Sequence, residues 1–172
     1  METIEPEIIP DDVQLDYCWV TDRLALGGAI WTRANMRQLS KAGITHVVDL
    51  QTFDDTQITD GTGITVLWCP FNDDLQHKEP ELFERVVGFV LPAYRQPESR
   101  IYLHCEQGIH RSPMILLAIL AVLGMKLTEA MELIHRARPQ AEFPTPYRQS
   151  IVRFLAAFRK RAAIAQPEVD SA

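Results

Sequence analysis

A reactive cysteine lies between two apolar stretches in residues 100–124. Residues 100–104 have the β-branched, aromatic and aliphatic character of a buried strand. Residues 112–124 are apolar on nearly every side, which predicts a buried central helix. The polar loop between them contains Cys105, Gly108 and Arg111. A strand that leads through a loop into a buried helix constrains the fold, because both apolar elements must be covered by others.

The loop reads H-C-x5-R-S over residues 104–112. Backbone N–H groups of a loop at a helix N-terminus can line an anion site, to which the helix adds its positive pole. Arg111 would bind two oxygens of a tetrahedral anion at once. The same field favours the thiolate of Cys105, the nucleophilic form. The pattern therefore indicates a cradle for a phosphate-like dianion, with Cys105 as the nucleophile at its floor.

A simpler alternative makes Cys105 a small buried hydrophobic residue and Arg111 an ordinary residue at a helix start. The spacing, the intervening Gly108, the hydroxyl of Ser112 and the strand–loop–helix context agree with the functional interpretation instead.

Strand-like and helix-like patterns alternate along the rest of the chain. Strands are predicted at 17–20, 24–26, 44–50, 64–69 and 100–104, and helices at 32–42, 79–94, 112–124, 128–137 and 145–158. Thr32 and Thr128 are the expected N-caps of two of these helices. The alternation predicts an α/β fold with a central, mostly parallel twisted sheet of about five strands, flanked by helices on both faces. Ligands of such sheets bind at the carboxyl ends of the strands, where the Cys105 loop would lie.

Composition narrows the class of protein. The 172 residues are 47% hydrophobic and 23% charged, with a formal net charge of −6, so no global basic field attracts nucleic acid or an anionic membrane. Three cysteines without paired spacing indicate a reducing compartment. With no signal-peptide pattern and no run long enough to span a bilayer, we expect a cytoplasmic monomer. Residues 1–16 are expected to be extended or partly disordered, 17–164 to form one domain, and 165–172 to be a frayed tail.

Chemistry at Cys105 also needs a proton for the leaving oxygen. The segment 70–74 follows the predicted strand 64–69 and would reach the same sheet edge if that strand is parallel to 100–104. Asp73 and Asp74 are the candidate acids, and both are equally well explained as turn-forming residues.

The H-C-x5-R-S loop and the apolar helix after it resemble the signature of the cysteine-dependent protein tyrosine phosphatase superfamily. Pro70-Phe71-Asn72-Asp73 before an amphipathic helix is similar to the dual-specificity branch. Residues 19–28, residues 39–50 and Tyr147 with the following helix also resemble that branch. The resemblance implies a dual-specificity phosphatase-like fold and a phosphatase catalytic domain over 17–164. It further implies a phosphorylated protein or peptide as substrate, hydrolysed at phosphotyrosine and phosphoserine or phosphothreonine.

The resemblance also implies roles for the catalytic residues. Cys105 would form a cysteinyl-phosphate, and Arg111 would stabilise the transition state electrostatically. Asp73 would protonate the leaving oxygen and then activate water. Ser112 would hydrogen-bond the thiolate, and His104 would hold the loop through backbone-directed hydrogen bonds. The phosphate would be bound by the backbone of Glu106, Gln107, Gly108, Ile109, His110 and Arg111.

Gln107 and His110 replace the Ala and Ser common in the branch, so these two side chains are expected to set substrate preference. The loop lacks the lysines of phosphoinositide phosphatases, and Glu106 would repel a multiply anionic head group. The acidic net charge disfavours an RNA 5′-triphosphate substrate. Other classes stay open: sulfur or arsenate transfer, and a non-catalytic phosphate-binding module.

Cys69 precedes the Asp73 segment. A Cys69–Cys105 disulfide that protects the nucleophile is one alternative, and a buried core cysteine is the favoured one. No spacing joins the histidines to carboxylates or cysteines as a metal site, so neither a metal nor a cofactor is expected.

Overall fold

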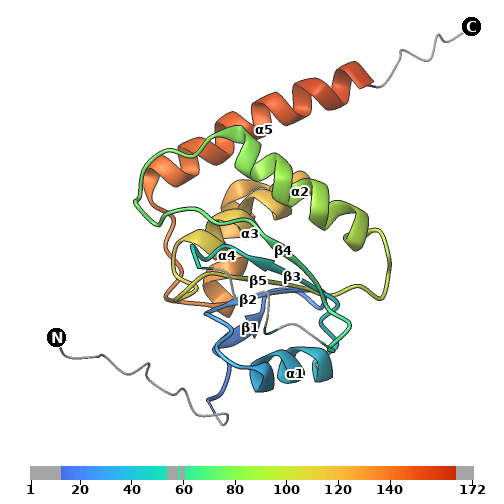
Figure 1. The fold of residues 1–172 in the computed structure, drawn as a ribbon. Coiled ribbons are helices and arrows are strands. Elements are labelled where there is room, and N and C mark those ends of the chain that lie inside the picture. Colours follow the sequence, from blue (N-terminus) through green and yellow to red (C-terminus); the bar gives the residue numbers. More distant parts are fainter. Residues whose placement is uncertain (1–12, 54–57, 59–60, 166–172) are drawn as a thin grey trace, which may run out of the picture.

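The computed structural model describes residues 13–53, 58 and 61–165. A five-stranded sheet with the order β1-β2-β5-β3-β4 lies at its centre (Figure 1). The strands are β1 (Tyr17–Trp19), β2 (Leu24–Gly27), β3 (His46–Asp49), β4 (Thr65–Trp68) and β5 (Ile101–His104). Only β1 is antiparallel to its neighbour among these strands; the other three pairings are parallel. The predicted α/β class with a mostly parallel sheet is confirmed.

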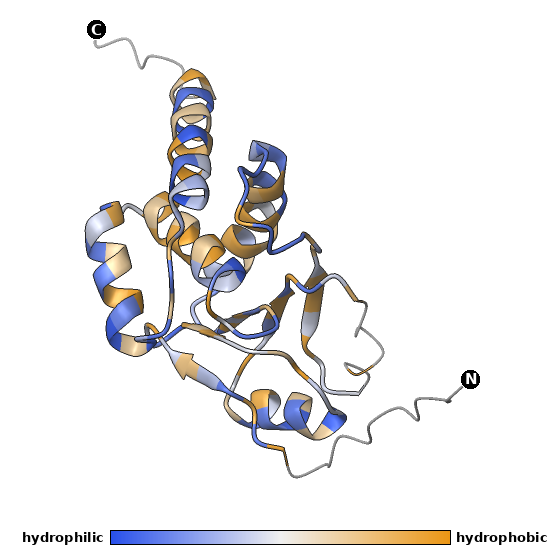
Figure 2. Ribbon diagram, turned by 90° about the vertical axis from the view of Figure 1, so that its left-hand side faces the viewer, coloured by the Kyte–Doolittle hydropathy of each residue, from blue (hydrophilic) through white to orange (hydrophobic). Residues whose placement is uncertain are grey.

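Helices cover both faces of the sheet. They are α1 (Arg33–Lys41), α2 (Pro80–Tyr94), α3 (Arg111–Val122), α4 (Leu127–Ala137) and α5 (Thr145–Ala165). Helix α1 lies on one face, and the other four lie on the opposite face (Figures 1 and 2). Successive side chains of a strand point to opposite faces, so Val47 packs with the α1 core and Val48 with the larger core.

Helix α3 occupies the middle of the larger core. Every residue from Arg111 to Ala121 is buried, because α2, α4 and α5 surround the helix away from the sheet. Phe83 of α2 stacks on Phe154 of α5, with ring centroids 5.1 Å apart. A helix enclosed on all sides has no solvent face, which explains why its sequence lacks a polar stripe.

The ends of the helices can be compared with the predicted caps and domain bounds. Thr32 caps α1 and accepts a hydrogen bond from the backbone N–H of Asn35 at 3.1 Å, as predicted. The prediction for Thr128 was wrong: α4 begins at Leu127, and the extended residue before it is Lys126. Helix α5 continues through Ala165, the first residue of the predicted tail. Residues 1–12 and 166–172 lie outside the described residues, so the predicted N-terminal segment and most of the tail stay predictions.

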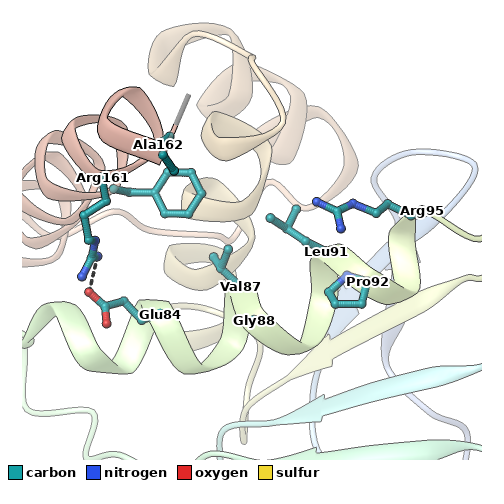
Figure 3. Close-up of a pocket in the computed structure, with 10 residues that line it drawn as sticks. Glu84, Val87, Gly88, Leu91, Pro92, Arg95, Arg161 and Ala162 are labelled. Atoms are coloured by element: carbon teal, nitrogen blue, oxygen red, sulfur yellow. Dashed lines mark hydrogen bonds and ion pairs between the residues drawn. The ribbon is translucent and has the colours of Figure 1, made fainter. Parts of the chain in front are cut away.

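Helices α2 and α5 enclose a groove of about 550 Å³ (Figure 3). Val87 and Leu91 line it from α2, and Phe158 lines it from α5. An ion pair between Glu84 and Arg161 joins the two helices beside it. None of the groove residues is a predicted site residue. No helix within the described ranges has the length and apolar character needed to cross a membrane.

The carboxyl ends of the parallel strands meet at one edge of the sheet. Cys105 follows β5 there, with Gly27 at the end of β2 on one side. Leu50 follows β3 on the other side, and its N–H donates to the carbonyl of His104 at 3.0 Å. This edge is where the predicted nucleophile lies, as expected for ligand sites of parallel sheets.

Gly27 is held so tightly that it has no room for a side chain. A Cβ there would lie 2.1 Å from the carbonyl oxygen of Asp16 and 2.9 Å from the hydroxyl of Tyr102. We expect Gly27→Ala to lower the free energy of unfolding by about 3 kcal/mol, measured by urea denaturation. Gly88→Ala is the matched control, because its Cβ meets nothing within 4 Å and lies inside α2. The control should gain about 0.5–1 kcal/mol from helix propensity. Equal effects of the two changes would contradict this account.

Candidate active site

The loop after β5 is held from outside through its carbonyl groups. The carbonyl of Glu106 accepts from the N–H of Ala29 at 3.0 Å, and that of Ile109 accepts from the N–H of Glu142 at 2.8 Å. The two carbonyls between them accept from the guanidinium of Arg138, at 2.9 Å for Gln107 and 2.7 Å for Gly108. Four consecutive carbonyls therefore point away from the loop's interior.

This arrangement fixes the direction of the loop amides. In a trans peptide the C=O of one residue and the N–H of the next point in opposite directions. The N–H groups of residues 107–110 must therefore point inward, and that of Gly108 donates to Sγ of Cys105 at 3.2 Å. Helix α3 begins at Arg111, so its positive pole lies at the same place. The loop therefore has the backbone orientation that the predicted anion cradle requires.

Arg138 was missed by the sequence analysis. Its side chain is only 2% exposed and pairs with both carboxylate oxygens of Asp16, at 2.6 and 3.0 Å, besides the two loop carbonyls. Hydrogen bonds from Arg138 outweigh desolvation and lower the pKa of Asp16. No local signal marked Arg138, because a cation at the C-terminus of a helix such as α4 is explained by the helix dipole alone.

Gly108 adopts a backbone conformation that favours glycine, with φ at +66°. A Cβ at this position would also lie 2.7 Å from Arg138 and 2.7 Å from the backbone of Gly27. The glycine inside the H-C-x5-R-S pattern is therefore required by both the turn and its packing.

Cys105 is buried at the floor of the cradle. Its Sγ lies 3.4 Å from Oγ of Ser112, which also lies 3.4 Å from the carbonyl of Gly27. A hydroxyl and an inward N–H at the same sulfur are the donors that a thiolate needs, both as nucleophile and as leaving group.

Arg111 presents part of its guanidinium to the cavity. Nη1 donates to the carbonyls of Leu50 and Phe71, each at 3.2 Å, which fixes the plane of the group. Nε is buried and has no hydrogen-bond partner in the described part of the chain. A buried donor without a partner is costly unless a ligand satisfies it, so this edge is suited to bind an oxyanion.

The two candidate acids, Asp73 and Asp74, have different surroundings. One oxygen of Asp73 accepts from the hydroxyl of Tyr147 at 2.9 Å, and the other lies 3.0 Å from Nδ1 of His110 and 4.0 Å from Nε of Arg111. Asp74 points elsewhere and pairs with Lys78, which lowers the pKa of Asp74. Of these two carboxylates, only Asp73 is positioned to act at Cys105.

A cavity of about 180 Å³ lies at this point. The residues that line it are Asp73, Cys105, Glu106, Gln107, Ile109, His110 and Arg111. The structure thus brings the predicted nucleophile, the predicted clamp and one predicted acid to a single opening. Gln107 and His110, which were expected to set substrate preference, both border it.

His104 lies behind the loop, on the face of the sheet that α1 covers. It is fully buried, stacks on the ring of Tyr102 and has Nε2 3.5 Å from Oδ1 of Asp49. Burial outweighs an interaction with the backbone of Cys105 and lowers the pKa of His104 to about 3. The imidazole is therefore neutral at physiological pH. Neither ring nitrogen has a hydrogen-bond partner in the described part of the chain, so the structure does not show the predicted hydrogen bonds from His104 to the loop backbone.

The three cysteines, all within the described residues, are free thiols. Cys69 belongs to the larger core with Cys105, and burial raises the pKa of Cys69. This agrees with the favoured interpretation of Cys69 as a core residue. Within the ranges that the structure describes, no group of three or more His, Cys, Asp or Glu residues is arranged to hold a metal ion.

The family model and two curated relatives that match this chain are all phosphatases. The family model "Dual specificity phosphatase, catalytic domain" matches residues 29–156. The chain is 30% identical over 105 residues to protein tyrosine phosphatase type IVA 3 of Mus musculus, covering 60% of each chain. It is 30% identical over 102 residues to dual specificity protein phosphatase 26 of Bos taurus, covering 57% of this chain and 48% of that one. The chain therefore spans about half the length of these curated relatives.

The fold has close counterparts among solved structures. The crystal structure of PTPMT1 superposes with a TM-score of 0.75 over 86% of this chain and 98% of that chain, at 19% identity. A second structure shows PTPMT1 in complex with PI(5)P, at 17% identity. At such identities the likeness concerns the fold.

Replacing Arg138 with an apolar side chain tests its hydrogen bonds to the carbonyls of Gln107 and Gly108. We expect Arg138→Met to lower the free energy of unfolding by about 2–4 kcal/mol in urea denaturation, because two loop carbonyls lose their donors. Tungstate, an oxyanion probe, should also bind more weakly. Asp16→Asn is the comparison variant: it removes the charge that faces Arg138 but leaves both loop carbonyls their donors, so tungstate affinity should stay close to that of the wild type. An Arg138→Met variant with unchanged tungstate affinity would show that Arg138 does not orient the loop.

Proposed function

The chain belongs to the dual specificity phosphatase family, and from this premise we propose that it hydrolyses phosphotyrosine and phosphoserine or phosphothreonine in proteins through a cysteinyl-phosphate intermediate. Family membership supports a cysteine-based phosphatase, a phosphoric monoester hydrolase. One observation carries the mechanism: Cys105, Arg111 and Asp73 line one cavity, and the buried Nε of Arg111 has no hydrogen-bond partner among the described residues. The donor edge and the nucleophile can engage one phosphoryl group together.

In the first step the thiolate of Cys105 attacks phosphorus and the bond to the ester oxygen breaks. Arg111 and the inward N–H groups of residues 107–110 hold the phosphoryl oxygens, whose charge is greatest in the transition state. Asp73 gives its proton to the leaving oxygen, so the alcohol departs neutral. The products of this step are the free alcohol and a phosphate bonded to Sγ.

In the second step Asp73, now a carboxylate, takes a proton from water. The water oxygen attacks phosphorus, the P–S bond breaks and inorganic phosphate leaves. Ser112, 3.4 Å from the sulfur, stabilises the departing thiolate. Tyr147 donates to Asp73 in both steps and keeps its carboxyl at the cavity. The residues supply a nucleophile, an anion clamp and a proton carrier, which is a complete set for ester hydrolysis.

The charges at the opening bear on the substrate class. Glu106 and Glu142 are more than half exposed at their side chains; Glu106 borders the cavity with Asp73, and Glu142 contacts His110, which also borders it. These carboxylates would repel a multiply phosphorylated head group more than a singly phosphorylated side chain. A phosphoinositide is the second candidate, because the structural counterpart PTPMT1 has been seen with PI(5)P.

The nucleophile is tested with Cys105→Ser. We expect the wild-type protein to hydrolyse phosphotyrosine and phosphothreonine peptides, and the variant to lose at least about 10⁴-fold in kcat/KM because serine is a far weaker nucleophile at neutral pH. PI(5)P and a 5′-triphosphorylated RNA complete the substrate panel, with phosphate release as the measurement. Preference for PI(5)P would favour the second candidate. Tight peptide binding without turnover would favour a non-catalytic module, and thiosulfate turnover alone would favour sulfur transfer.

The acid is tested by comparing two adjacent carboxylates. Asp73→Asn should lower kcat/KM for a phosphotyrosine peptide by about 100-fold or more, because the leaving oxygen loses its proton donor. Asp74→Asn should stay within about threefold of the wild-type value, since Asp74 faces Lys78 and the solvent. A reversed order of the two effects would make Asp74 the acid and reject the assignment.

A further inference from the structure

His110 is the point at which three separate segments meet. It lies in the loop after β5, and its Nδ1 is 3.0 Å from Asp73 in the segment between β4 and α2. Its Nε2 is 3.1 Å from Glu142, between α4 and α5. The N–H of Glu142 also binds the carbonyl of Ile109, the residue before His110. The two ring nitrogens thus contact one carboxylate each.

The two contacts of the imidazole depend on its charge. A neutral imidazole has one N–H, whereas an imidazolium donates from both nitrogens. Partial burial disfavours the cation, but the hydrogen bonds and charges of Glu142 and Asp73 outweigh it and raise the pKa of His110. Those two carboxylates face the ring from two other segments, and Arg111 reaches the same oxygen of Asp73 at 4.0 Å. The cationic form therefore fits the observed geometry.

Asp73 needs side-chain contacts to hold its position. It lies in the stretch between Trp68 and Pro80, where the chain forms neither helix nor strand. Tyr147 binds one of its oxygens and His110 binds the other, so the carboxyl is held from both sides. Only His110 of these two belongs to the loop that carries Cys105. Its hydrogen bond therefore joins the acid directly to that loop, beside the longer contact of Arg111 with the same oxygen of Asp73 at 4.0 Å.

We propose that His110 is a positioning residue for the acid–base steps, tying the Asp73 carboxyl to the loop that carries Cys105, with Glu142 holding the far side of the ring. This inference rests on the proposed function. When Asp73 releases its proton to the leaving oxygen, a carboxylate forms that accepts a stronger hydrogen bond from His110. The ring thus both places the acid and stabilises the charge that develops on it.

The experiment compares two aryl phosphates that differ in their need for an acid. Phenyl phosphate has a poor leaving group, whereas 2,4-dinitrophenyl phosphate expels a stable anion without a proton. We expect His110→Ala to lower kcat/KM for phenyl phosphate by about 10–50-fold, as misplacement of a catalytic group does. For the dinitrophenyl ester we expect a change within about twofold. A side chain that serves only to bind phosphate would affect both esters equally.

Matched variants separate positioning from other roles. Adding His110→Ala to Asp73→Asn should cause no further loss with phenyl phosphate, because the acid that His110 places is already absent. Glu142→Gln should also lower kcat/KM mainly for phenyl phosphate, by a smaller factor than His110→Ala. His110→Gln keeps an N–H donor group, the side-chain amide, and should recover part of the loss. Full additivity of His110→Ala and Asp73→Asn, or equal losses on both esters, would overturn the inference.

Failure of this inference differs from failure of the proposed function. If the wild-type protein hydrolyses neither ester in a Cys105-dependent way, the proposed phosphatase fails, and the positioning role fails with it. If the wild type is active and Asp73→Asn loses activity mainly on phenyl phosphate, the function stands. An unselective His110→Ala effect in that case rejects the positioning role alone.

Discussion

The guanidinium of Arg138, bound to the carbonyls of Gln107 and Gly108, is the contact on which the site depends. It turns two neighbouring peptide groups so that their N–H donors face the cavity, and the backbone contacts of Glu106 and Ile109 continue the pattern on either side. Because a peptide group is rigid and trans, an outward carbonyl implies an inward amide. Together with the guanidinium of Arg111, these inward amides line the site that is proposed to bind phosphate. The buried guanidinium of Arg138 is itself balanced by Asp16.

The opposite side of the cavity is assembled from segments far apart in the chain. Asp73 comes from the stretch after β4, His110 from the loop after β5, Glu142 from the segment between α4 and α5, and Tyr147 from α5. The parallel sheet makes this convergence possible, since its strands deliver their carboxyl ends to one edge. The loop of Cys105 therefore packs against the sheet on one side, and the side-chain contacts of these segments lie on its other side.

The sheet also separates two kinds of histidine. His104 is buried on the face covered by α1, where burial lowers its pKa to about 3 and leaves it neutral. His110 lies at the opening between two carboxylates, which raise its pKa despite partial burial. His104 and His110 lie six positions apart in the chain, and their pKa values shift in opposite directions because their environments differ.

The sequence by itself determined the α/β class and the order of the elements, because strand and helix periodicities are local. It also identified Cys105 and Arg111 as the candidate nucleophile and clamp, because both lie in one continuous loop. The sequence could not decide between Asp73 and Asp74 as the acid, because the two side chains are chemically identical. Their contacts distinguish them, since Asp73 binds Tyr147 and Asp74 pairs with Lys78. Thr128 was assigned as a cap although Lys126 precedes the helix, since propensity does not fix where a helix starts. Arg138, Glu142 and the His110 contacts were decided by tertiary structure, because each joins residues that no spacing along the chain brings together.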